Sequence, residues 1–332
     1  MAEKNVKRRY NKWLVIGLLS VAIGVPNGTV IKILADEIGS IAFTFLKFAL
    51  MSLVFLPIVI SFAVRHKKIL KRNIFNLTMV TIGTAVSVLA FYRAIELSTA
   101  SYTSIVSLLS PIVLVVMSNR LIKEKVGARA VAGITLAAIG GLLVVALPAV
   151  IHGAIGSVFY PAATFLVIIN CFCHPMSIVY QRKSNEDGIP FAVYAGISAI
   201  GTTLLALVVS MFQAEGPSGI VAQAANVSAW GWAGIIYSGF LVTFVARILW
   251  IKSYQHMGSA AGGGLSYLEM LLGVVLPMVV LGESLSIELL IGAILILLGV
   301  YIAESRPAAK NGMKKHHYGN RLHYLHRHSR LH

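Results

Sequence analysis

Apolar residues dominate the chain in runs of about 20, and short polar connections separate one run from the next. A helix of about 20 apolar residues is long enough to cross the ~30 Å hydrocarbon core of a bilayer. The pattern therefore predicts an all-α integral membrane protein with ten transmembrane helices. The predicted spans are 13–34, 40–64, 74–95, 98–121, 127–151, 158–180, 189–213, 229–251, 257–281 and 285–303.

The two halves of the chain end in the same unit: an apolar span, a polar break with a glutamate, and a second apolar span with two glycines. The aligned pairs are Glu124 with Glu283, Gly133 with Gly292 and Gly140 with Gly299. Because each half holds five spans, an odd number, the second copy must insert upside down relative to the first. We predict two inverted five-helix repeats, 13–151 and 158–303, between a basic N-terminal segment, 1–12, and a basic histidine-rich tail, 304–332.

Charge gives the orientation. The formal net charge is +16, which in a soluble protein would suggest nucleic acid, but 57% of the residues are hydrophobic and the mean hydropathy is +0.82. Lys and Arg are concentrated in alternate connections, whereas the connections around Glu37, Glu96, Glu215 and Glu283 contain none. Basic residues are retained on the cytoplasmic side. Both termini are therefore predicted to be cytoplasmic, with no nucleic-acid partner, and the external connection 214–228, rich in Gly, Ala and Gln, is expected to be a mobile loop.

Four ionisable residues within the spans are the main candidates for a site, because such side chains usually face a cavity or a partner. Glu269 lies at the centre of its span and could take up a proton or pair with a cation, or serve as a structural carboxyl. Lys47 lies about five residues from the centre of its span, ~7 Å at helical rise, and could bind an anion or pair with Glu269. Arg247 could line a cavity or extend to the cytoplasmic headgroups, and His174 could relay protons or pack between helices.

Polar residues near predicted helix breaks complete the candidate site. Asn27 and Asn170 lie near prolines within spans, and Ser107 and Tyr267 lie in the aligned spans 98–121 and 257–281. Close helix packing is the alternative role for the hydroxyl residues. Prolines within a span can free backbone groups beside a cavity; Pro26, Pro111, Pro175 and Pro277 are candidates for such breaks.

Two further expectations concern charges near the predicted external ends. Lys32 is expected to extend to the headgroup region, and Arg93 and Glu96, three residues apart, are expected to form an ion pair. The histidine-rich tail could bind a metal or lie solvated near anionic lipid.

No phosphate-binding glycine loop, paired metal-binding histidines or nucleophile elbow is present in the sequence. The sequence therefore predicts neither an enzyme nor a cofactor. Two copies of a long membrane unit suggest a transporter. Without a nucleotide-binding motif, transport would run down a gradient of substrate, protons or another ion, and Glu269 is the candidate proton carrier.

The repeated pattern of apolar run, Glu and two glycines seven residues apart, with Pro111 ahead of its first copy, resembles the EamA family of the drug/metabolite transporter superfamily over about 13–303. The resemblance implies a ten-helix exporter of amino acids or similar small metabolites in a cell membrane, with the bacterial inner membrane as the expected location. It also implies alternating access and peripheral fifth and tenth spans. Met270 stands where the second repeat usually has proline, and Lys47 where an arginine is common. A sugar-phosphate or nucleotide-sugar exchanger and a non-transporting membrane sensor are the alternatives; oligomeric state is undetermined.

Overall fold

The computed structural model describes residues 2–122, 129, 131–133, 135–137, 139–140, 143, 160–257, 259–283 and 287–304. The described residues form helices and short connections, with no strand among them. The helices are α1 (Ala2–Gly24), α2 (Asn27–Leu34), α3 (Ser40–Arg65), α4 (Lys67–Arg72), α5 (Ile74–Leu97), α6 (Ala100–Ser107), α7 (Ser110–Ile122), α9 (Pro161–Glu186), α10 (Phe191–Ser210), α11 (Gly216–Asn226), α12 (Ala229–Ile236), the π-helix η1 (Tyr237–Ala246), α13 (Arg247–Met257), α14 (Ser259–Leu281) and α15 (Ile287–Glu304).

The predicted spans agree with these helices. Six helical segments in the described part of the chain are long and apolar enough to cross a membrane, and they match predicted spans one to three and six to eight. Shorter apolar helical segments, Ala100–Leu114, Leu271–Leu281 and Leu290–Gly299, match spans four, nine and ten. Apolar side chains such as Leu53, Val64 and Val279 are exposed on the outer faces of the helices, where a bilayer would cover them.

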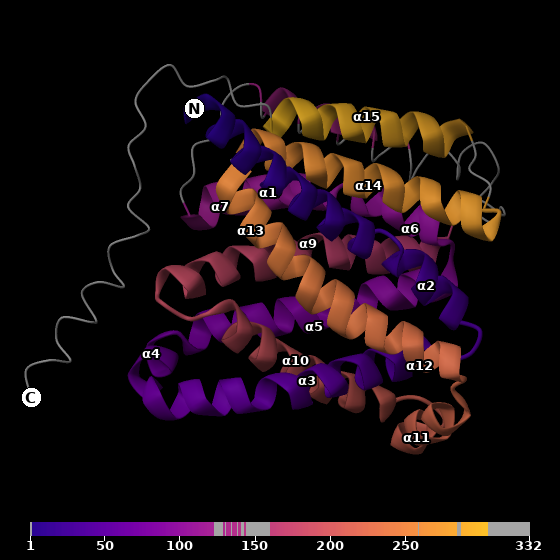
Figure 1. Cartoon of the computed structure of the whole chain (residues 1–332). Helices are drawn as coiled ribbons and strands as arrows, with labels where there is room; N and C mark the ends of the chain where they lie inside the picture. Colours follow the sequence, from indigo (N-terminus) through magenta and orange to yellow (C-terminus); the bar gives the residue numbers. More distant parts are fainter. Residues whose placement is uncertain are drawn as a thin grey trace, which may run out of the picture.

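The long helices run from one end of the molecule to the other (Figure 1). The N-terminus and α4 lie at one end, which we call the α4 end, and α2 and α11 lie at the opposite end, the α11 end. Across the two halves of the chain, α5 packs on α9, α3 on α10, α1 on η1 and α13, and α6 on α14. These are the partners that two repeats related by a two-fold axis would give, since the third span meets the sixth just as the eighth meets the first.

Contacts of the repeated glycines indicate the inversion directly. A Cβ on Gly140 would lie 2.8 Å from the carbonyl oxygen of Gly292, and a Cβ on Gly299 would lie 2.5 Å from that of Gly133. Gly133 therefore faces Gly299, and Gly140 faces Gly292. The two helices are antiparallel and are related by a local two-fold axis. Only glycine allows backbones to approach this closely.

Buried side chains form a core between the halves rather than within either one. One cluster surrounds α6 and includes Tyr102, Ile105 and Val106, with Val274 of α14. These apolar groups pack between helices of the two halves, and their van der Waals contacts hold the helices in register.

Two of the four candidate prolines coincide with helix breaks. The first span divides at Val25–Pro26 into α1 and α2, and the fourth divides at Leu108–Leu109, just before Pro111. The helices α9 and α14 continue through Pro175 and Pro277. A π-helical stretch in the eighth span was not anticipated from the sequence; such segments are rare and frequently occur at functional sites.

Two expectations were wrong. Residues 214–228 do not form a loop: Gly216–Asn226 are the helix α11, which begins with Pro217 in its first turn, a position where proline is favourable. Lys32 does not extend to the headgroups, because its Nζ donates to the backbone carbonyls of Ile95 and Ser98 at the end of α5. Glu124, most of the fifth span and the histidine-rich tail beyond Glu304 lie outside the described residues.

The predicted orientation can be tested by labelling. In a variant without its native cysteines, a cysteine at exposed Ser218 of α11 should react with an impermeant thiol reagent in intact cells, whereas one at exposed Lys68 of α4 should react only after lysis. The reverse pattern would contradict the predicted topology.

Candidate functional site

The break between α1 and α2 organises the polar interior. Pro26 has no N–H and cannot continue the hydrogen-bond ladder. Nearby, the carbonyl of Ile23 accepts a hydrogen bond from the hydroxyl of Tyr237, at 2.6 Å. Because Tyr237 is the first residue of η1, the irregular parts of the first and eighth spans lie against each other.

Lys47 lies at the centre of a buried polar group contributed by three spans besides its own. Its Nζ donates to the hydroxyl of Tyr92 at 2.5 Å and to Oγ of Ser238 at 2.9 Å. Ser238 in turn donates to Oδ1 of Asn27 at 2.6 Å. We call these residues, Lys47, Tyr92, Ser238 and Asn27, the Lys47 group.

The Lys47 group lacks an anion among the described residues. Lys47 is only 2% exposed, and no described carboxylate lies within 4.0 Å of its Nζ. The rings of Phe48 and Tyr92, whose centroids lie 5.3 and 5.0 Å from Nζ, provide cation–π contacts. The predicted pairing of Lys47 with Glu269 was therefore wrong. The alternative role of Lys47, binding of an anionic group, stays a prediction.

Arg247 is the centre of a second group, which contains three ionisable partners from α9, α10 and α14. Its guanidinium interacts electrostatically with Glu269 and Tyr194, and also with His174. Its Cζ lies 5.4 Å from the ring centroid of Trp250. We call Arg247, Glu269, His174 and Tyr194 the Arg247 group.

The Arg247 group is open rather than closed by a direct ion pair. Arg247 and Glu269 do not approach within 4.0 Å, both are partly exposed, and His174 is exposed. Arg247 nevertheless interacts electrostatically with each of the other three side chains, which come from α9, α10 and α14.

The α1–α2 break connects the two groups. A Cβ on Gly24 would lie 3.1 Å from Oε1 of Glu269, whereas Asn27, three residues later, belongs to the Lys47 group. Four consecutive residues thus contact both groups, so a movement of this break would change the surroundings of Lys47 and Glu269 together.

Three other candidate residues lie apart from these groups. Asn170 donates through Nδ2 to the carbonyl of Ser87 at 3.1 Å and is buried between α9 and α5. Ser107 donates to the carbonyl of Thr103 in its own helix, just before the break ahead of α7. The side chain of Tyr267 lies outside the described part of the structure.

Acidic residues at the α11 end connect the two halves by capping helices. Glu283 accepts hydrogen bonds from the backbone N–H groups of Ala100 and Ser101, at 2.9 and 2.8 Å, at the start of α6. Glu37 accepts from the backbone N–H and the hydroxyl of Ser228, directly before α12. Carboxylates are favourable at helix N-termini because of the helix dipole and the free N–H groups there.

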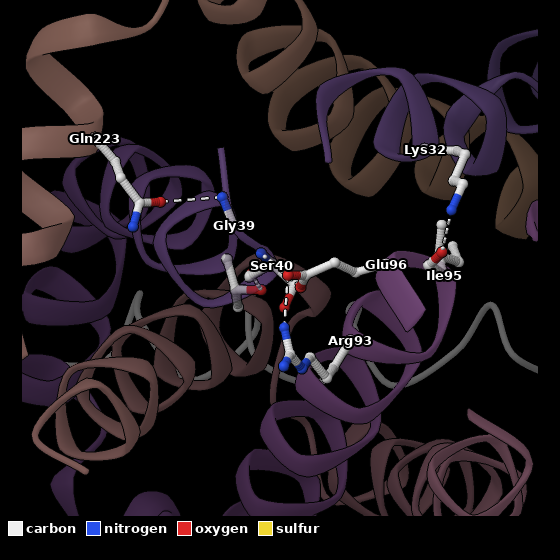
Figure 2. Close-up of polar contacts among 8 residues, drawn as sticks. Lys32, Gly39, Ser40, Arg93, Ile95, Glu96 and Gln223 are labelled. Carbon is white, nitrogen blue, oxygen red and sulfur yellow. Dashed lines mark hydrogen bonds and ion pairs between the residues drawn. The ribbon is translucent and has the colours of Figure 1, made fainter. Parts of the chain in front are cut away.

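A further set of contacts at this end is shown in Figure 2. The amide oxygen of Gln223 in α11 accepts from the N–H of Gly39 at 3.0 Å, which is another link between the halves. Glu96 accepts from the N–H of Ser40 at 3.1 Å and forms an ion pair with Arg93 at 2.5 Å. The predicted Arg93–Glu96 pair is confirmed, although its carboxylate also caps α3.

A family model matches the chain twice, over residues 11–146 and 161–304, and describes the EamA-like transporter family. The chain belongs to the EamA-like transporter family. It is a multi-pass membrane protein with the all-helical, ten-helix repeat fold of that family.

Among the curated relatives of this EamA-like transporter is the uncharacterized transporter YyaM of Bacillus subtilis (strain 168), 23% identical over 195 residues. The match spans 59% of this chain and 61% of that protein. The chain is also similar to a protein whose crystal structure has been solved. The similarity covers 88% of this chain and 96% of that protein's chain, with a TM-score of 0.56 and 20% sequence identity. This likeness shows the fold alone.

Sequence reasoning missed Tyr92, Tyr194 and Ser238 as members of the two polar groups of this EamA-like transporter. A hydroxyl at mid-span depth was the available signal, but serine and tyrosine occur at many such positions here. Only the packing of η1 against α3 selects Ser238 from among them.

Proposed function

We propose that this protein is a secondary transporter that exports a small amino-acid-like metabolite across a bacterial cell membrane by alternating access. The observation that carries the proposal is the pair of polar groups at the α1–α2 break, where Lys47 is a buried cation without a described anion. A buried, uncompensated charge is costly, and an anionic part of a substrate would offset that cost.

The charges favour a zwitterionic or carboxylate-bearing solute over a phosphate ester. A guanidinium such as that of Arg247 binds a carboxylate through two N–H groups. Glu269 interacts electrostatically with this guanidinium and could accept an ammonium group. The same carboxylate would repel a doubly charged phosphate, so the sugar-phosphate exchanger is the weaker alternative.

Alternating access would use the unequal connections at the two ends. At the α11 end, Glu37, Gln223 and Glu283 each bond the backbone of the other half. At the α4 end, Ser253 donates through Oγ to the carbonyl of Trp13 at 2.8 Å, and Arg72 and Asp187 form an exposed pair at 3.5 Å, which contributes little stability. Release to the outside would require the capping contacts at the α11 end to break.

The experiment that tests the proposal is substrate flux in sealed liposomes containing the purified protein. Counterflow should be saturable for at least one amino acid or related carboxylate in a labelled panel, and absent from liposomes without protein. Flux only of phosphate esters would support the exchanger instead. If no member of either panel moves, the protein acts as a sensor or scaffold and the transport proposal fails.

A second experiment tests coupling to protons, for which Glu269 is the proposed carrier. Glu269→Gln cannot lose or gain a proton, but its amide oxygen still accepts a hydrogen bond from an ammonium group. This variant should therefore retain exchange at equal pH but lose the response of net flux to an imposed pH gradient. His174→Asn is the control, because His174 is another titratable side chain beside Arg247 in this group. If the wild type ignores the gradient, or if His174→Asn alone removes the response, Glu269 is not the carrier.

A further inference from the structure

A groove of about 820 Å³ opens on the outer surface of the bundle near the α4 end. Its walls come from the end of α3, from α4, from the first part of α5 and from one residue of α10. The wall includes Lys67, Lys71, Ile74, Thr78, Ile82 and Ile197. The groove is separate from the Lys47 group, because Ala63 in its wall lies 16 residues from Lys47 on α3, ~24 Å at helical rise.

The groove is apolar except at one end. Ile74 and Ile82 in its wall are 67% and 46% exposed, so the groove faces outward, where a bilayer would cover it. The hydroxyl of Thr78 donates to the carbonyl of Ile74 in its own helix, which leaves its methyl group for the wall. From Ile74 to Ile82 the groove follows α5 for ~12 Å, a length suited to an extended hydrocarbon chain.

Both charges in the wall are positive and lie at the α4 end of the groove. Lys67 and Lys71 are four residues apart, so they lie on one side of α4. Both side chains are exposed, and neither makes a hydrogen bond or ion pair with any residue that the structure describes. Lys68, between them, is outside the groove, and Arg72 pairs with Asp187.

We propose that this groove is a binding site for an anionic phospholipid. Lys67 and Lys71 hold the phosphate at the membrane surface, and an acyl chain lies along α5 as far as Ile82 and Ile197. Lysines next to an apolar surface attract anionic lipid through their charge while the hydrocarbon is buried. Because α3 and α5 belong to the first half and Ile197 to the second, the lipid contacts both halves of the transporter.

The test is lipid binding to the delipidated full-length protein, measured by native mass spectrometry with phosphatidylglycerol and with phosphatidylcholine of the same acyl chains. The wild type should prefer phosphatidylglycerol. The variant Lys67→Ala/Lys71→Ala should lose roughly 30-fold in affinity for it, the factor that corresponds to about 1 kcal/mol per lysine. Lys68→Ala removes the same charge from the same helix outside the groove, and its affinity should stay within a few-fold of wild type.

A second variant tests the apolar part of the site. Thr78→Trp places a large ring in the groove at an exposed position, so it should reduce binding of both lipids without lowering the melting temperature. Inorganic phosphate at millimolar concentration should not compete, because it lacks a chain. The proposal is overturned if the two lipids bind equally, if Lys68→Ala loses as much affinity as the double variant, or if free phosphate displaces the lipid.

Discussion

Replacing Lys47 with methionine should stop transport while leaving the folded protein at least as stable as the wild type. Truncating one member of a buried, hydrogen-bonded charge interaction costs about 2–5 kcal/mol. If substrate supplies the missing anion, the initial rate of counterflow should fall by at least about 30-fold. Lys47→Arg, which retains the charge, should keep part of the activity.

Stability distinguishes this role from a structural one. Lys47 is 2% exposed and is bonded only to neutral groups, Tyr92 and Ser238, among the described residues. Replacing a buried charge by an apolar side chain of similar volume is often neutral or stabilising. The melting temperature of Lys47→Met in detergent should therefore be unchanged or higher. A fall in melting temperature with normal transport would show that Lys47 is structural.

Lys32 provides a matched control with the opposite expectation. Its Nζ caps the end of α5 through the carbonyls of Ile95 and Ser98, and it takes part in neither polar group. Lys32→Met should therefore lower the melting temperature and affect the transport rate per folded molecule less than Lys47→Met does.

Adding a single methyl group at Gly299 should destabilise the protein, although alanine is normally the better helix former. A Cβ there would lie 2.4 Å from the backbone nitrogen of Ala137 and 2.5 Å from the carbonyl oxygen of Gly133. Neither backbone atom can rotate away, so α15 would have to move from its partner helix. Overpacking of this kind costs about 1–3 kcal/mol, which should appear as a lower melting temperature.

The control is Gly28→Ala in α2, where a Cβ would meet nothing within 4 Å. Glycine in a helix is less favourable than alanine by up to about 1 kcal/mol, so this substitution should leave the melting temperature unchanged or raise it. Both substitutions replace a helical glycine with alanine. The melting temperature should fall for Gly299→Ala and stay unchanged or rise for Gly28→Ala. A rise in melting temperature for Gly299→Ala would contradict the close packing of the repeated glycines.

Much of the fold followed from local properties of the sequence. Whether a segment such as 40–64 crosses the membrane depends on its own hydrophobicity and length, and orientation depends on charges in the adjoining connections. The close contact between the repeated glycines came from the structure, where a Cβ on Gly140 or Gly299 would meet backbone atoms of the other helix. The segment 214–228 was misjudged because its glycines suggested a loop, whereas Gly216–Asn226, with Pro217 in the first turn, forms α11.

The sequence by itself determined which residues carry charge at membrane depth. Lys47, Arg247 and Glu269 are recognised because they are charged residues within long apolar runs. Only the tertiary structure decided which of them meet. Helix rotation and the break at Pro26 place Lys47 beside Tyr92 and Ser238, and leave Glu269 with Arg247. Hydrophobic periodicity cannot supply this information, because in a bilayer the lipid-facing side of a helix is as apolar as its packed side. Partners of a polar side chain therefore depend on backbone approach between distant segments, which is a property of the assembled bundle.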